Sequence, residues 1–276
     1  MVDAVHVDRA GPDTAPPVLL LHGWGSSAAL MRPLAEALAD TFAVYALDLP
    51  GHGHSPPPPE PWGMEAHVHL VRDVICERIH PTHGTAPLPI IGHSNGGRIA
   101  LFLAADPQTQ DLVDRLILIS PSGIPRRRSA GVTMRRSIAR LVKAPFTWLP
   151  EPLRSPATDW LRHTLLWRAL GSSDYRALDG VMRATFVQVV NSYVDDRLDQ
   201  ITAPTLLFWG TDDEAITREQ MRILEDGLPD AGLVPLDGAG HYGYLDTPGP
   251  VVAGIRHFLR DYAGPAAAPS EASSAA

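Results

Sequence analysis

The stretch PLPIIGHSNGG, residues 87–97, decides the fold. An apolar run stops at Gly92, Ser94 follows between glycines, and a helical pattern, GGRIALFLAA, begins directly afterwards. In a strand–turn–helix of this kind the spacing G-x-S-x-G holds a serine in a strained turn, where larger neighbours would collide with the backbone. The stretch is therefore either a plain turn or a serine positioned to attack a carbonyl carbon. Residues far away in the chain distinguish the two interpretations.

Short apolar runs alternate with helical patterns on both sides of this stretch. The expected strands are Val18–Leu21, Phe42–Leu49, Pro89–Gly92, Leu116–Ser120, Thr205–Gly210 and Leu233–Leu236. The expected helices are Leu30–Ala39, Met64–Ile79, Gly97–Ala105, Glu219–Gly227 and Val251–Tyr262. Nearly continuous apolar runs are typical of strands covered on both faces, so the pattern predicts an α/β fold with a mostly parallel, doubly wound sheet. The early stretch VDAVHVDRA, residues 2–10, predicts an antiparallel edge strand.

The alternation breaks between about residues 123 and 202, where helical patterns separated by prolines replace the strand signals. The expected helices there are Val132–Lys143, Thr158–Leu170 and Tyr175–Val190. A segment of this length is too long for an ordinary loop, so we expect an inserted helical cap over one end of the sheet. The predicted organisation is a core in two parts, residues 1–122 and 203–262, a cap at 123–202, and a small, polar, disordered tail at 263–276.

Composition excludes several classes of protein. A chain of 276 residues with 45% hydrophobic residues can bury a large core, and a net charge of −8 argues against a nucleic-acid partner. Its one cysteine, Cys76, rules out an internal disulfide framework and a cysteine-rich zinc site, and we expect it to be buried in a helix. Neither a signal-peptide pattern nor an apolar run of the ~18 residues that a membrane helix needs is visible, which predicts a cytoplasmic protein without a membrane partner.

Ser94 needs a base, because a serine hydroxyl is a poor nucleophile at neutral pH. The stretch GAGHYGYLDTP supplies His241 after the last expected strand, and TLLFWGTDDEAI supplies Asp212 and Asp213 after the strand before it. A carboxylate of this kind fixes the tautomer of the base. Another strand ends in HGWG, residues 22–25, where the backbone N–H of Trp24 can join that of Asn95 in an oxyanion hole.

These stretches together resemble the α/β-hydrolase family. HGWG, DLPGHGHS (Asp48–Ser55), GHSNGG, GTDD and GAGH look like the usual blocks of that family in their usual order, from about Val18 to Leu259 apart from the cap. The resemblance implies an esterase-like serine hydrolase with a helical cap, and the G-x-x-D spacing of the family favours Asp213 over Asp212. The predicted site consists of catalytic Ser94, Asp213 and His241 and oxyanion-hole residues Trp24 and Asn95.

Other histidines are interpreted as structural. His22 and His93 flank the predicted site, and His22 is expected to order the oxyanion loop, whereas His52 and His54 are expected on the surface. The remaining histidines show no close metal-ligand spacing, and GHGHS is not followed directly by a helix as a dinucleotide-binding loop would be. We therefore expect neither a metal nor a cofactor.

The expected cap contains a basic group and an apolar group of residues. The basic residues are Arg126, Arg127, Arg128, Arg135, Arg136, Arg140 and Lys143. They form either a solvated helix face or a dock for an anionic substrate or an acidic carrier protein. The apolar residues are Trp148, Trp160, Leu161, Leu165, Leu166, Trp167, Phe186 and Val190. Most are expected to fix the cap to the core, and some to line an acyl pocket facing Ser94.

The function predicted from these residues is hydrolysis of carboxylic esters of small or medium apolar acyl groups, through an acyl-enzyme on Ser94. Alternatives are C–C bond hydrolysis of ring-cleavage dienones, hydrolysis of thioesters or carrier-protein esters, cofactor-free perhydrolysis, and ligand binding by a receptor on a hydrolase scaffold. Relatives that cleave dienones usually show H-G-x-G-P-G, where this chain has Ser26 and Ser27. Dehalogenase and epoxide-hydrolase activities are disfavoured because those relatives carry aspartate in place of Ser94.

Overall fold

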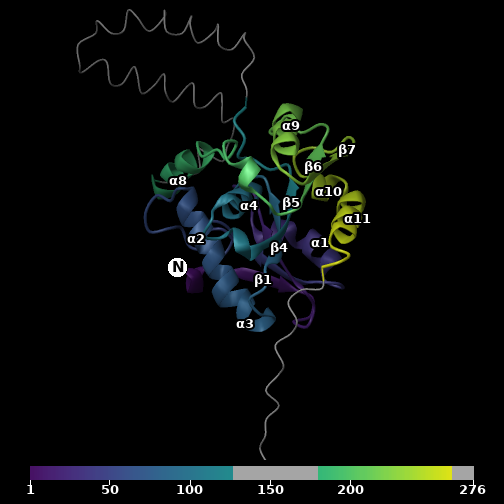
Figure 1. The fold of residues 1–276 in the computed structure, drawn as a ribbon. Helices are drawn as coiled ribbons and strands as arrows, with labels where there is room; N and C mark the ends of the chain where they lie inside the picture. Colours follow the sequence, from purple (N-terminus) through teal and green to yellow (C-terminus); the bar gives the residue numbers. More distant parts are fainter. Residues whose placement is uncertain (127–179, 263–276) are drawn as a thin grey trace, which may run out of the picture.

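A seven-stranded sheet forms the centre of the protein (Figure 1). The computed structural model of the chain describes residues 1–126 and 180–262. The strands are β1 (Val7–Ala10), β2 (Pro17–Leu21), β3 (Ala43–Leu47), β4 (Leu88–His93), β5 (Val113–Ile119), β6 (Thr205–Gly210) and β7 (Ala231–Leu236). They lie in the order β1-β3-β2-β4-β5-β6-β7, and only β1 pairs antiparallel with its neighbour. The predicted α/β fold, with its mostly parallel sheet and antiparallel edge strand, is confirmed.

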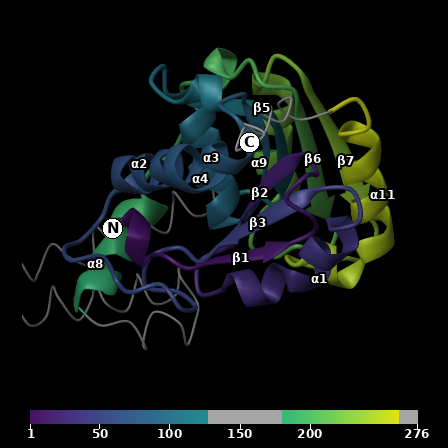
Figure 2. The same ribbon diagram turned by 90° about the horizontal axis from the view of Figure 1, so that it is seen from below.

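Helices cover both faces of the sheet (Figure 2). On one face lie α1 (Ala28–Leu38) and α11 (Pro248–Phe258), and on the other lie α2 (Met64–Val74), α4 (Asn95–Ala105) and α9 (Arg218–Gly227). Shorter helices are α3 (His80–His83) and α10 (Gly243–Asp246), and α8 (Gly180–Val190) precedes β6. Within the described ranges, no helix combines the length and the apolar character needed to cross a bilayer.

Alternate side chains of each central strand enter two separate cores. In β2, Leu19 and Leu21 belong to the core under α2 and α4, whereas Val18 and Leu20 belong to the core under α1 and α11. All four side chains are fully buried. Burying one such side chain contributes about 1.5–3 kcal/mol, and a strand that does so on both faces must be apolar throughout. The doubly wound architecture therefore follows from the unbroken apolar runs.

The helix expected over Met64–Ile79 is not regular. The α-helix ends at Val74, and a π-helical turn spans Ile75–Ile79 before α3 begins. Ile75 and Ile79 occupy the buried positions of this turn, whereas Cys76 is exposed. The prediction of a buried Cys76 was therefore wrong, because it assumed one α-helical face along the whole segment.

The described part of the segment between β5 and β6 contains α8, the C-terminal part of the expected helix Tyr175–Val190. The Thr185 hydroxyl accepts a hydrogen bond from the Trp62 N–H at 3.0 Å, and Arg98 donates one to the Val189 carbonyl. These contacts hold α8 against the core. The other two expected cap helices and the tail from residue 263 lie outside the described residues, so the division into cap and core remains a prediction.

Candidate active site

Ser94 occupies a sharp turn between β4 and α4. Its backbone has φ +50° and ψ −110°, a conformation that side-chain-bearing residues adopt only under strain of about 1–3 kcal/mol. Surrounding backbone fixes this turn, because the Ser94 N–H donates to the Ile119 carbonyl at 3.1 Å and the Ser94 carbonyl accepts from Ser122 N–H at 3.0 Å. The strain is therefore held by neighbouring β5 and by the loop that follows it.

The glycines of GHSNGG allow α4 to approach the sheet closely. A Cβ atom on Gly96 would lie 2.1 Å from the Leu21 carbonyl oxygen, and one on Gly92 would lie 2.7 Å from the backbone of Gly97. Real Cβ atoms do not approach backbone so closely, so no larger residue fits without moving α4 away from β2. This packing places the beginning of α4 beside the end of β2, where the expected oxyanion loop starts.

His241 and Asp213 meet at the carboxyl ends of β6 and β7. The Nδ1–H of His241 donates to Oδ2 of Asp213 at 2.9 Å. The other oxygen, Oδ1, accepts N–H bonds from Ala215 at 2.8 Å and Ile216 at 3.0 Å. Burial by itself raises the pKa of Asp213, but the hydrogen bonds from His241 and from Ile216 outweigh it and hold the pKa below its usual value. Asp213 is therefore a carboxylate at neutral pH, while the adjacent Asp212 is exposed.

His93 fixes the backbone next to the His241 ring. Its Nε2–H donates to the His241 carbonyl at 2.9 Å, and the two ring centres lie 4.8 Å apart. Burial, assisted by the nearby charge of His241, lowers the pKa of His93 to about 3. His93 is therefore uncharged at neutral pH, and it supports the loop that carries His241.

His22 anchors the loop that contains Trp24. Its Nδ1–H donates to the Gly23 carbonyl at 2.7 Å, and its Nε2 accepts from the Leu49 N–H at 2.9 Å. Burial lowers the pKa of His22 to about 4, which keeps this ring neutral. The two bonds join the loop after β2 to the end of β3, in line with the expected ordering role.

His52 differs from its prediction. It is only 8% exposed, and its ring lies 4.9 Å from that of Trp24, whereas His54 is exposed as expected. The turn after β3 folds back beneath the loop after β2, so a polar residue in the turn becomes buried. Sequence spacing gives no sign of this contact, because it joins two separate loops.

The buried neutral histidines make stability depend on pH. The unfolded chain binds protons at His22 and His93 below about pH 6.5, whereas the folded protein binds them only near pH 4 and pH 3. The free energy of unfolding therefore decreases as the pH falls through this window, by about 2 kcal/mol for each histidine between pH 7 and pH 5, or about 4 kcal/mol together. Urea denaturation at pH 7 and pH 5 measures the difference.

A matched pair of variants serves as the control for this pH dependence. His22→Gln should remove its share of the loss at pH 5, whereas His257→Gln, at an exposed histidine on α11, should leave the slope unchanged. Equal stability of the unmodified protein at the two pH values would contradict the prediction.

One cavity of about 550 Å³ joins most of the predicted site. Ser94, Asn95, Trp24 and His241 all line it, and Asp213 supports His241 from behind. Phe186, Val189 and Val190 of α8 form an apolar wall. Two of the eight apolar residues expected in the cap, Phe186 and Val190, line this cavity, and the other six lie outside the described residues.

Arg98 is a cavity residue that the sequence reasoning missed. It lies four residues after Ser94 on α4 and is only 6% exposed. The available signal was an arginine in the otherwise apolar helix pattern GGRIALFLAA. Of the basic residues expected in the cap, Arg126 lines the cavity in an exposed position, and the others lie outside the described residues.

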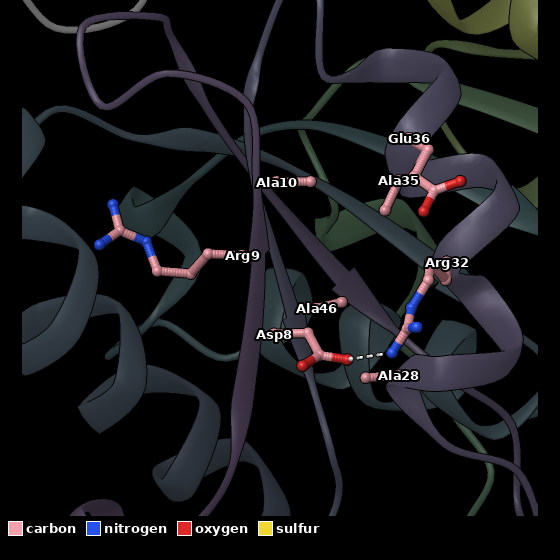
Figure 3. A pocket seen from close by; sticks show the side chains of 8 residues that line it. All are labelled: Asp8, Arg9, Ala10, Ala28, Arg32, Ala35, Glu36 and Ala46. Carbon is pink, nitrogen blue, oxygen red and sulfur yellow. Dashed lines mark ion pairs between the residues drawn. The ribbon is translucent and has the colours of Figure 1, made fainter.

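A second hollow, of about 230 Å³, lies between β1 and α1 (Figure 3). Its lining consists of alanines and charged residues: Asp8, Arg9, Ala10, Ala28, Arg32, Ala35, Glu36 and Ala46. Arg32 pairs with Asp8 at 3.7 Å, and the Arg9 side chain points away from α1. This lining contains no serine, no cysteine and no histidine, so the larger cavity is the candidate active site.

His6, Asp48 and His54 gather with candidate ligand atoms within 4.8 Å of one another. Sequence spacing could not reveal this group, since 42 residues separate His6 from Asp48. The Asp48 carboxylate accepts backbone N–H bonds from Ala28 at 2.7 Å and His54 at 2.9 Å. We interpret Asp48 as a clamp for the turn after β3, and the expectation that the chain binds no metal remains a prediction.

Comparison with known proteins gives one family. A family model described as alpha/beta hydrolase fold matches residues 16–248. The pimeloyl-[acyl-carrier protein] methyl ester esterase of Neisseria meningitidis is 30% identical over 91% of this chain and 96% of that protein. An uncharacterized protein of Mycobacterium tuberculosis is 26% identical over 89% of this chain and 76% of its own length. The solved structure of a thermophilic esterase from Thermogutta terrifontis has a TM-score of 0.65 and 23% identity, with 93% of each chain covered.

Proposed function

Because this chain belongs to the α/β-hydrolase fold family, we propose that it is a serine hydrolase that cleaves carboxylic esters of small or medium apolar acyl groups. The observation that carries this proposal is the His241–Asp213 hydrogen bond at 2.9 Å behind a cavity that Ser94 also lines. A nucleophile, a base and an orienting carboxylate are the minimum set for acyl transfer.

In the first half of the reaction Ser94 forms an acyl-enzyme. Its Oγ forms a bond to the ester carbonyl carbon while Nε2 of His241 takes the hydroxyl proton. The carbonyl oxygen becomes an oxyanion, held by the backbone N–H groups of Trp24 and Asn95. The Asn95 N–H is the first of α4 and has no partner within the helix, so it is free to bind negative charge. The bond to the leaving oxygen then breaks, and His241 gives its proton to the departing alcohol.

In the second half water releases the acid. His241 takes a proton from a water molecule whose oxygen bonds to the acyl carbon, and it returns that proton to Oγ of Ser94 as the ester bond to the enzyme breaks. Asp213 keeps the proton of the resting imidazole on Nδ1 and stabilises the imidazolium that forms twice in the cycle. The reaction consumes only the ester and one water molecule, so the proposal requires no cofactor.

The apolar wall supports the assignment of the acyl group. Phe186 lies with its ring 5.0 Å from that of Trp24, and Val189 and Val190 continue the same wall. An apolar acyl chain gains about 25 cal/mol for each Å² of its surface that this wall removes from water. The similarity to the Neisseria esterase supports a second candidate, a methyl ester at the end of a carrier-linked acyl chain, with exposed Arg126 beside the cavity as a contact for an anionic carrier.

The proposal is tested by the time course of p-nitrophenol release from p-nitrophenyl acetate, butyrate and octanoate. An esterase releases many equivalents per protein molecule, with an initial burst of about one equivalent where deacylation is slower than acylation. A receptor on a hydrolase scaffold would release one equivalent at most. Release that stops at one equivalent, or that does not exceed the rate in buffer for any of the three esters, would overturn the proposal.

A further inference from the structure

Arg98 lies beside the nucleophile in the same cavity. It follows Ser94 by four residues on α4, so its Cα lies about 6 Å further along the helix axis. The Arg98 N–H donates to the Ser94 carbonyl at 3.1 Å, which confirms that the two residues occupy successive turns. Arg98 lines the cavity together with Ser94 and His241, so part of its side chain faces the same space as the nucleophile and the base.

The guanidinium of Arg98 has few partners for a buried cation. One of its N–H groups donates to the Val189 carbonyl, whereas Nε has no hydrogen-bond partner. No carboxylate within residues 1–126 and 180–262 pairs with it. Burial lowers the pKa of Arg98 to about 10, so it still carries its charge at neutral pH. A buried charge without a counter-ion is strongly disfavoured, and such charges are normally paired.

Among the residues that the structure describes, the other charged groups on the cavity wall do not supply that counter-ion. The Val189 carbonyl lies at the end of α8, where the helix dipole gives only a partial negative charge. Glu214 and Arg126 also line the cavity, but both are exposed, so water screens their charges. The cavity itself, with its volume of about 550 Å³, has room for an anionic group beside Arg98.

We propose that Arg98 binds a free carboxylate at the far end of the acyl chain, so that the preferred substrates are half-esters of short dicarboxylic acids. The ester carbonyl lies at Ser94, the methylene chain lies along the wall formed by Val189 and Val190, and the carboxylate accepts hydrogen bonds from the guanidinium. A guanidinium presents a planar fork of donors that matches a carboxylate. This inference rests on the proposed function and names its substrate class.

A purely structural role for Arg98 explains less of what is observed. Holding α8 requires only one donor to the Val189 carbonyl, and the neutral side chain of Gln220 performs a similar task by donating to the Ile124 carbonyl at 2.7 Å. An arginine in that role adds a desolvated charge and a donor, Nε, without a partner. A carboxylate ligand in the cavity supplies the missing counter-ion.

The test compares kcat/KM for the monomethyl and dimethyl esters of succinate, glutarate and adipate. Each pair has the same chain and the same scissile bond and differs in the distal charge. The unmodified protein should prefer the half-ester by about 10-fold or more at one chain length, mainly through KM. In Arg98→Met this preference should fall by about 10- to 100-fold, and Arg98→Lys should retain part of it.

The ratio within each pair separates binding of the carboxylate from support of α8, since a displaced α8 slows both esters together. Arg222→Met removes an equal charge from an exposed position on α9, outside the lining of the cavity, and should change the ratio by less than about threefold. Calorimetry of Ser94→Ala with monomethyl glutarate adds a readout that is independent of turnover, and binding should weaken when Arg98→Met is added.

The two proposals fail in different ways. Turnover of neutral esters without a half-ester preference, or a preference that survives in Arg98→Met, would overturn the carboxylate site and leave the esterase intact. Absence of all turnover would defeat the esterase, and the calorimetric arm would still decide whether Arg98 binds a carboxylate.

Discussion

The Ser94→Ala variant is expected to lose at least about 10⁴-fold in kcat for p-nitrophenyl butyrate while remaining folded. The hydroxyl supplies the bond that forms the acyl-enzyme, and the oxyanion hole and substrate binding alone retain only a small part of the rate enhancement. Alanine adopts the strained φ of +50° at a cost similar to that for serine, so the free energy of unfolding should change by less than about 1 kcal/mol. Steady-state kinetics and urea denaturation measure the two quantities.

Ser122 provides the matched control for this variant. It lines the same cavity, and its backbone N–H donates to the Ser94 carbonyl, but its side chain has no role in the proposed reaction. Ser122→Ala should therefore keep kcat within a few fold. Activity above about one per cent in Ser94→Ala, or an equal loss in Ser122→Ala, would contradict the assignment of Ser94 as the nucleophile.

The fold could be predicted for two reasons. Its strands are apolar on both faces, and each distinctive residue in its turns has a single physical reason for being there. The expected strand Thr205–Gly210 has the observed bounds of β6, and the antiparallel pairing of β1 with β3 was also expected. Errors arose where the helical period expected from the preceding residues does not continue along the chain. The α-helical period does not continue through Ile75–Ile79, and Cys76 is consequently exposed.

The residues of the candidate site also fall into two groups, those that a local sequence pattern predicts and those that it does not. Ser94, Asp213 and His241 each follow a strand in a distinctive local pattern, so the sequence singles them out even though 147 residues separate the first from the last. Arg98 and His52 acquire their environments only when separate segments pack together: α8 covers Arg98, and the loop of Trp24 covers His52. Burial of a polar residue by a distant segment leaves no periodic signal near that residue.

Asp213→Asn is expected to lower kcat by about 10⁴-fold, and the hydrogen bonds around this residue give the reason. Oδ1 of Asp213 accepts N–H bonds from Ala215 and Ile216, so an asparagine would place its carbonyl oxygen there. Its amide NH₂ would then face Nδ1 of His241 and donate to it. The proton of the neutral imidazole would be forced onto Nε2, the atom that must accept the proton of Ser94. In this tautomer His241 could not act as the base.

Asp212→Asn makes the same change of charge one residue earlier in the chain. Asp212 is exposed, and the His241 ring bonds to Asp213, so kcat of Asp212→Asn should stay within about threefold of the unmodified protein. Comparing the two variants by steady-state ester hydrolysis separates the tautomer argument from a general effect of negative charge. Similar losses in both variants would favour the general effect of charge, and a greater loss in Asp212→Asn would identify Asp212 as the partner of the base.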